Sequence, residues 1–132
     1  MAIKRNTKTF SDFNLLFTAS PSTGDITKKS NEEAIKASLR NLISTKNYER
    51  PFHPEIGCQI FSLLFENFTS VTTQVMRQTI QDVVNKFEPR VDILDVGIFE
   101  TLDENNLDVS ITFKIINIEL PVTFNTSIQR VR

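Results

Sequence analysis

Pro89 divides the chain into two parts whose apolar residues follow different periods. Before this proline the spacing is helical, with apolar residues at Met76, Ile80, Val83, Val84 and Phe87. After it, apolar and polar residues alternate as they do in a strand. Proline lacks a backbone donor and disfavours the α region for the preceding residue, so a helix should end near Phe87 and Glu88 should be extended. The stretch Phe87-Glu88-Pro89-Arg90-Val91 is therefore predicted to join a long helix to a β-rich C-terminal part.

Glu88 and Arg90 flank this proline with opposite charges. In an extended segment, residues two apart share a face, so both side chains should project the same way. One interpretation is a local surface ion pair, which contributes about 0–1 kcal/mol to stability. The other is a two-pronged contact with a partner protein, where truncating either residue costs about 2–5 kcal/mol of binding. The second interpretation predicts that Arg90→Ala leaves the melting temperature within a few degrees but prevents assembly.

Two further helices and a loop are predicted before this junction. Ser30 and Glu33 have the spacing of a capping box, so a first main helix is expected over residues 32–44. Residues 49–58 contain two prolines and a glycine, which predicts an ordered loop, followed by a short helix. Thr69 or Ser70 is expected to cap the long helix.

The chain is predicted to divide into an N-terminal arm and one domain. Residues 1–30 carry a short apolar cluster and are expected to form an extended arm, and residues 31–132 a single domain. The apolar residues of the arm need a surface, and the simplest arrangement is a strand at the edge of the sheet.

The C-terminal part is predicted to hold a β-hairpin and an edge strand. Residues 107–115 alternate most regularly and should pair with the strand before them. In that earlier strand Val91 and Ile93 have the opposite phase to the residues that follow, which a β-bulge near Ile93 and Leu94 would reconcile. The last segment alternates around Pro121, which cannot donate to a ladder and so belongs at an edge or a bulge. The predicted fold class is α+β, with two main helices packed on one face of a small antiparallel sheet.

The composition disfavours several classes of function. The 132 residues have a net charge of −1, so no overall field attracts nucleic acid, an anionic membrane or an acidic substrate. Cys58 and His53 are the single cysteine and histidine, which leaves no internal disulfide and too few ligands for the usual Cys/His metal sites. No apolar run approaches the roughly 18 residues of a membrane span. We therefore expect a soluble, unexported protein without a metal, a cofactor or a small-molecule substrate, and without nucleic acid or membrane as a partner.

Three stretches of the sequence, taken in order, resemble the signature of a known family. They are Arg50-Pro51-Phe52-His53-Pro54-Glu55-Ile56-Gly57, Leu64-Phe65-Glu66-Asn67 and Phe87-Glu88-Pro89-Arg90-Val91. Together they resemble the lysozyme-like baseplate wedge family of contractile-tailed phages, which has homologues in type VI secretion baseplates. The resemblance spans roughly Asp12 to Thr126.

The resemblance implies a structural role in the baseplate of a virion tail, assembled in the host cytoplasm. It implies that Glu88, Pro89 and Arg90 bind the helical core bundle of the wedge, and that the partners are other wedge proteins and the tail sheath protein. The small sheet would start the first sheath ring by strand addition, for which a free edge is suited. The residues expected on the sheath-facing strands are Val109, Ile111, Phe113, Val122 and Phe124.

Two other functions remain as alternatives, a peptidoglycan-degrading glycosidase and a soluble regulatory adaptor on the same fold. A glycosidase needs two carboxylates, one with a raised pKa, and the candidates are Glu55, Glu66 and Glu88. The arginine beside Glu88 should lower its pKa, and the chain has no tryptophan to stack on a sugar. Cys58 and His53 lack a third partner for nucleophilic catalysis. No catalytic residue is assigned, and the chain is expected not to be an enzyme.

Overall fold

The computed structural model describes residues 10–101, 106–116 and 118–129, and it has an α+β architecture. Its elements, in chain order, are β1 (Ser11–Phe13), β2 (Lys28–Ser30), α1 (Asn31–Ser44), α2 (Ile60–Leu63), α3 (Ser70–Phe87), β3 (Val91–Thr101), β4 (Asn106–Ile115) and β5 (Pro121–Gln129). The predicted fold class is confirmed, and both main helices and the short helix occur where the sequence predicts them.

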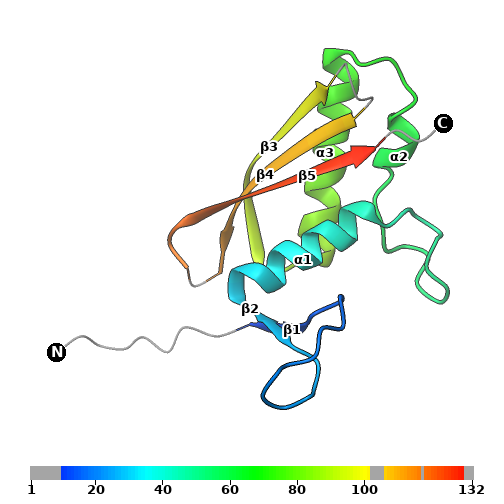
Figure 1. Ribbon diagram of the computed structural model, residues 1–132. Helices are drawn as coiled ribbons and strands as arrows, with labels where there is room; N and C mark the ends of the chain where they lie inside the picture. Colours follow the sequence, from blue (N-terminus) through cyan, green and yellow to red (C-terminus); the bar gives the residue numbers. More distant parts are fainter. Residues whose placement is uncertain (1–9, 102–105, 117, 130–132) are drawn as a thin grey trace.

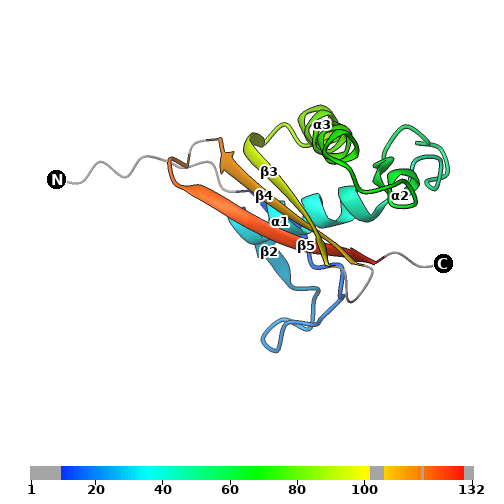
Figure 2. The same ribbon diagram turned by 90° about the horizontal axis from the view of Figure 1, so that it is seen from above.

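The three-stranded antiparallel sheet has the order β3-β4-β5, and its helices cover one face. In β4 every second residue is buried, namely Leu107, Val109, Ile111, Phe113 and Ile115. The residues between them are polar and exposed or half-buried. Viewed from above, α2 and α3 lie on the same side of this sheet (Figure 2). Because only one face of β4 is apolar, the opposite face of the sheet is left open to solvent.

Apolar stripes on the two main helices complete the core. The buried residues of α1 are Ala34, Ile35, Leu39, Leu42 and Ile43, and those of α3 are Met76, Ile80 and Val84. The long helix ends as the proline predicts, with the backbone N–H of Glu88 donating to the carbonyl of Val84 at 2.8 Å. At its start, the Thr69 hydroxyl accepts from the backbone N–H of Thr72, as expected for an N-cap.

The start of α1 differs from the predicted capping box. Ser30 occupies the N-cap position, but its side chain makes no capping hydrogen bond. Ser30 instead pairs with Ser11 as part of β2. The next residue, Asn31, has a left-handed φ of 47°. Its backbone N–H donates to the carbonyl of Phe10, and its side-chain Oδ1 accepts from the backbone N–H of Phe10. The helix start is therefore fixed by a segment about twenty residues away in sequence rather than by its own first turn.

The bulge and the edge strand occur where they were predicted. The register between β3 and β4 shifts between Ile93 and Asp95, so Leu94 has no ladder partner. This shift brings Val91 and Val96, which have opposite phases in the sequence, to the same buried face. Pro121 is the first residue of β5, which pairs only with β4 among the described residues.

The N-terminal segment forms a hairpin of its own. β1 pairs with β2 in a separate two-stranded sheet, so the prediction that it adds a strand to the edge of the main sheet is wrong. The hairpin lies against the side of α1 that faces away from the main sheet (Figure 1). Residues 1–9 of the predicted arm lie outside the described part of the chain.

Residues 46–58 form the ordered loop that the prolines predict. Its base is closed by a bridge between Lys46 and Cys58. Gly57, with a φ of 150°, lies so close to this base that a Cβ would meet backbone atoms of Lys46 at 2.8 Å. At the tip, Tyr48 and Phe52 have left-handed φ values of 66° and 71° and are 81% and 95% exposed.

Candidate functional site

The junction after α3 forms a closed polar network. Arg90 donates from Nε to Oε1 of Glu88 at 2.6 Å and from Nη2 to Oε2 at 2.8 Å. The hydroxyl of Ser38, on α1, donates to Oε2 of the same carboxylate at 2.5 Å. The side chains of Glu88 and Arg90 thus project the same way, as predicted, but they meet each other and helix α1. The side chain of Glu88 is only 4% exposed.

The outer side of the Arg90 guanidinium contacts the N-terminal hairpin. Both of its Nη atoms lie 3.3 Å from Oδ2 of Asp12, in β1. The guanidinium carbon lies 5.6 Å from the centre of the Phe10 ring, a cation–π distance. Arg90 therefore joins three segments of the chain, namely the junction itself, α1 through Glu88 and Ser38, and the hairpin.

These contacts keep the network charged. Burial acts to raise the pKa of Glu88, but the hydrogen bonds from Arg90 and Ser38 and the charge of Arg90 outweigh it and lower the pKa. The hydrogen bond with Glu88 raises the pKa of Arg90, against desolvation. The result is a bidentate ion pair, the strong geometry for a guanidinium and a carboxylate.

The predicted partner-binding residues differ in their access to solvent. Glu88 is 3% exposed and both of its carboxylate oxygens are occupied, whereas Pro89 is exposed and Arg90 is half-buried. The interpretation as a surface ion pair therefore does not fit, since the pair is local but buried, whereas the contact with a partner protein stays a prediction. Access to a partner exists at Pro89 and at the outer side of Arg90.

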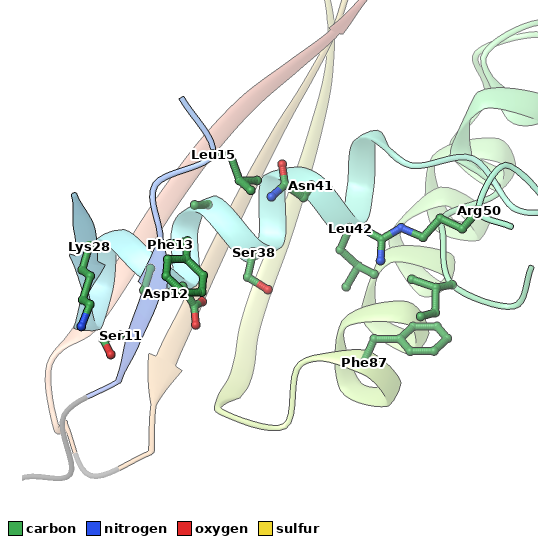
Figure 3. Close-up of a pocket in the computed structure, with 13 residues that line it drawn as sticks. Ser11, Asp12, Phe13, Leu15, Lys28, Ser38, Asn41, Leu42, Arg50 and Phe87 are labelled. Atoms are coloured by element: carbon green, nitrogen blue, oxygen red, sulfur yellow. The ribbon is translucent and has the colours of Figure 1, made fainter. Parts of the chain in front are cut away.

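A groove of about 620 Å³ opens beside this network, between α1 and the N-terminal hairpin (Figure 3). Its floor is one face of α1, formed mainly by short side chains at Ala34, Ala37, Ser38 and Asn41. These positions follow the i, i+3, i+4, i+7 spacing of a single helical face. Ser38 belongs both to the groove and to the Glu88 network.

The walls of the groove come from segments distant in sequence. The hairpin contributes Phe13, Leu15 and Lys28, and the loop contributes Arg50. Phe13 and Leu15 are 68% and 56% exposed, which leaves apolar surface along one rim. In the close-up, Lys28 lies near one end of the groove and Arg50 near the other (Figure 3).

The residues expected on sheath-facing strands lie in the core. Val109, Ile111, Phe113 and Phe124 are at most 3% exposed, and Val122 is partly buried against the same cluster. Moreover β4 is the central strand, paired on both sides, so it cannot accept an incoming strand. Of the two strands expected to face the sheath, only β5 has a free edge in the described structure, and that edge offers backbone groups rather than these side chains.

The candidate catalytic residues are not arranged for acid catalysis. Glu55 is exposed, and its own backbone hydrogen bond, followed by that from His53 at 3.2 Å, lowers its pKa. The pKa of Glu88 is also lowered, whereas a general acid needs a raised one. Glu66 lies beside a small pocket on the far side of the core. Cys58 is buried, which raises the pKa of its thiol and makes it a poor nucleophile.

Neither a metal site nor a membrane-spanning helix is found among the described residues. Within the described ranges, no group of three or more His, Cys, Asp or Glu side chains could hold a metal ion. None of the helices in the described structure is long and apolar enough to cross a membrane.

Sequence reasoning missed several members of this site. Asp12 lies 78 positions from Arg90 in sequence, and Ser38 lies 50 from Glu88. Neither residue belongs to a motif. A buried carboxylate requires hydrogen-bond donors, which could have indicated a residue such as Ser38. The sequence did not predict that Glu88 is buried, so this indication was missing.

Comparison with known sequences identifies one family. Residues 29–119 match the family described as Baseplate wedge protein gp25. The chain is also 37% identical over 93 residues to Baseplate wedge protein gp25 of Enterobacteria phage T4, and the aligned part covers 70% of each chain.

Three solved structures share this fold. A putative tail lysozyme from Geobacter sulfurreducens is 23% identical, with a TM-score of 0.64, and the match covers 74% of this chain and 91% of that one. A chain of the anti-feeding prophage baseplate is 22% identical, with a TM-score of 0.65 and coverage of 94% and 88%. A chain of the type VI secretion baseplate complex is 17% identical, with a TM-score of 0.59 and coverage of 71% and 88%.

The structural matches show a shared fold, and the sequence matches go further. The family match over residues 29–119 runs from α1 through the loop, α2, α3 and the junction to the β3–β4 hairpin, and so includes all three motifs quoted from the sequence. The resemblance seen in the sequence is thereby confirmed, and the chain belongs to the baseplate wedge protein gp25 family.

Proposed function

We propose that this protein is a structural component of the baseplate wedge of a contractile tail, and that it acts by binding neighbours rather than by catalysis. Family membership is the observation that carries this proposal. The lowered pKa values of Glu55 and Glu88 support it, because they are unsuited to glycosidic acid catalysis. The protein would be assembled in the host cytoplasm and reside in the tail baseplate of the virion.

The proposed contact with the helical core bundle of the wedge is centred on Pro89 and Arg90. Glu88 has a supporting role in this proposal, since its buried carboxylate fixes the Arg90 guanidinium from behind. The exposed proline limits how far this short connection can flex. A rigid, pre-oriented guanidinium loses little freedom when it binds a partner.

The docking role requires a test that does not confuse binding with folding. Arg90→Ala alone leaves Glu88 buried and charged, so loss of assembly would have two explanations. The double variant Glu88→Gln/Arg90→Gln removes both charges together and keeps groups that can form hydrogen bonds. We expect it to fold, by near-ultraviolet circular dichroism, and to be lost from purified wedges. Normal incorporation of the folded double variant would refute docking at this junction.

The proposed contact with the tail sheath protein uses the outer edge of β5. Its nine residues, Pro121–Gln129, pair with β4 on one side only in the described structure. An unpaired edge of this length offers backbone groups for an incoming strand, as in other cases of β-augmentation. Most of its outward-facing residues are polar, which keeps the free edge soluble before assembly.

Two adjacent proline substitutions can separate the two edges of β5. In an antiparallel strand, successive backbone N–H groups point to opposite sides, so one of Asn125→Pro and Thr126→Pro removes a donor to β4 and the other removes an outward donor. The variant that retains its melting temperature identifies the outward position. We expect that variant to enter baseplates but to start few sheath rings, scored by electron microscopy. Normal sheath formation by this variant would argue against strand addition at β5.

The absence of muralytic activity is part of the proposal and has a direct assay. Purified protein should not clear a peptidoglycan suspension. If clearing does occur and is lost in Glu55→Gln or Glu66→Gln, the protein is an enzyme and the structural assignment is incomplete.

A further inference from the structure

The groove between α1 and the N-terminal hairpin has properties that the proposed contact at Pro89 and Arg90 does not use. We propose that it is the seat of an amphipathic helix of the wedge core whose apolar face is flanked by carboxylates. This inference rests on the proposed function and specifies the chemistry of the partner at a surface next to the junction.

The floor of the groove permits another helix to approach closely. Ala34, Ala37, Ser38 and Asn41 present short side chains along one face of α1. From Ala34 to Leu42 this face extends about 12 Å, or two helical turns. The groove volume of about 620 Å³ corresponds to on the order of twenty water molecules. An incoming apolar stripe of two turns would displace this water and contact the floor.

The apolar rim adds a second contact surface. Phe13 and Leu15 line the groove and remain largely exposed, next to a floor that includes the apolar Ala34 and Ala37. At the far end, Leu42 and Phe87 supply further apolar surface. A partner with a polar surface would leave these groups wet, whereas an apolar stripe buries them.

The charges of the groove select an acidic partner. Its ionisable lining residues are Asp12, Lys28 and Arg50. Asp12 is paired with Arg90, whose guanidinium it shares with Glu88. Lys28 and Arg50 have no acidic partner within 4.0 Å among the described residues, and they lie toward opposite ends (Figure 3). The groove therefore presents two uncompensated cations, which fits carboxylates on either side of an apolar stripe.

The groove is built from residues on both sides of the point where the family match begins. The segment that matches the family begins at residue 29, so Phe13, Leu15 and Lys28 lie before it. The floor and Arg50 lie within it.

Charge reversal tests the proposal without disturbing the fold, because Lys28 and Arg50 are exposed. The probe is the purified wedge-core complex of the same particle, with binding measured by calorimetry at low and high salt. We expect Lys28→Glu/Arg50→Glu to bind roughly tenfold or more weakly at low salt and to lose the salt sensitivity of the wild type. The matched control is Arg77→Glu, an exposed charge on α3 away from the groove, which should bind normally.

A steric variant and a chemical probe extend the test. Ala37→Phe fills the floor without changing charge and should weaken binding by a similar factor; if it fails to fold, the two exposed charge positions still decide the question. Carbodiimide coupling should link the Lys28 amine to an aspartate or glutamate in a helical segment of the core, identified by mass spectrometry.

The outcomes separate this inference from the proposed function. Normal binding by Lys28→Glu/Arg50→Glu, together with loss of binding by Glu88→Gln/Arg90→Gln, would contradict binding of a helix in the groove and would support the contact at the junction. Tighter binding after charge reversal would mean a basic occupant and would also overturn this inference. If the wild type does not bind the wedge core at all, both proposals fail.

Discussion

The junction at Glu88–Arg90 and the loop at residues 46–58 both contain proline-bearing parts of the same signature, yet they use their side chains in opposite ways. The junction turns its charged groups inward, where Ser38 and Asp12 complete the contacts. The loop turns its aromatic residues outward, with Phe52 95% exposed. A motif therefore does not tell by itself whether its residues stabilise the fold or face a partner, and stability measurements can distinguish the two regions.

The largest expected effect is at the junction. Arg90→Ala leaves a buried carboxylate without its counterion, so we expect a loss of about 3 kcal/mol in the free energy of unfolding. For a chain of this size that corresponds to roughly 10 °C in melting temperature. The double variant Glu88→Gln/Arg90→Gln should recover much of this loss. A shift of only a few degrees for Arg90→Ala would instead agree with the expectation from the sequence that the pair serves a partner contact and contributes little to the stability of the fold.

The base of the loop should be nearly as sensitive, unlike its tip. In Gly57→Ala the new Cβ would meet Lys46 backbone atoms at 2.8 Å and the Asn47 nitrogen at 2.9 Å, at a φ of 150° that alanine rarely adopts. We expect a loss of about 2 kcal/mol, measured by denaturant unfolding. Gly24→Ala is the matched control, since its φ of 68° is also left-handed but no atom lies within 4 Å of the new Cβ. Equal losses at both positions would mean that backbone conformation alone sets the cost.

The pH dependence of the unfolding free energy should reveal the contribution of the buried Glu88 carboxylate, because this contribution is lost at low pH. The pKa of Glu88 is lower in the folded protein than its ordinary value of 4.5, so its stabilising contribution is present above that value and is lost as the pH falls through the lowered one. The difference in unfolding free energy between wild type and Glu88→Gln should therefore shrink on acidification. Ser38→Ala removes one donor and should raise the pKa of Glu88 toward its ordinary value, which carbon-13 titration can measure. An unchanged titration would show that this hydrogen bond does not hold the charge.

The smallest effect on stability is expected at the loop tip. Phe52 contacts little of the protein and has a left-handed φ of 71°, so Phe52→Ala should change the free energy of unfolding by at most about 0.5 kcal/mol. Wedge incorporation is the informative measurement here. Normal stability with impaired incorporation would identify the tip as a contact site. A large loss of stability would show instead that the loop tip, like the junction, stabilises the fold.

The sequence predicted what depends on local pattern and missed what depends on distant contacts. The stripe on α3, its end at Phe87, the bulge near Leu94 and the edge position of β5 all follow from periodicity and from the chemistry of proline. The hairpin of residues 10–30 and its contact with Arg90 do not, because three-residue strands have no readable period and Asp12 is far away in sequence. The same limit applies in part to Glu88: Arg90 beside it could be read from the sequence, but the Ser38 donor comes from α1.

The bulge at Leu94 has a geometric consequence of its own. Without Leu94, residues Val91, Ile93 and Val96 would alternate in a single phase, so we expect the fold to tolerate its removal. Leu94 separates the start of β3, next to the junction, from the rest of the strand. Because a bulge increases the local twist, it affects the angle between these two parts of β3. Deleting Leu94 should yield a folded protein with a straighter β3, visible in a crystal structure. If β5 contacts a neighbouring protein as proposed, a change of a few degrees at this bulge would tilt its free edge relative to the junction.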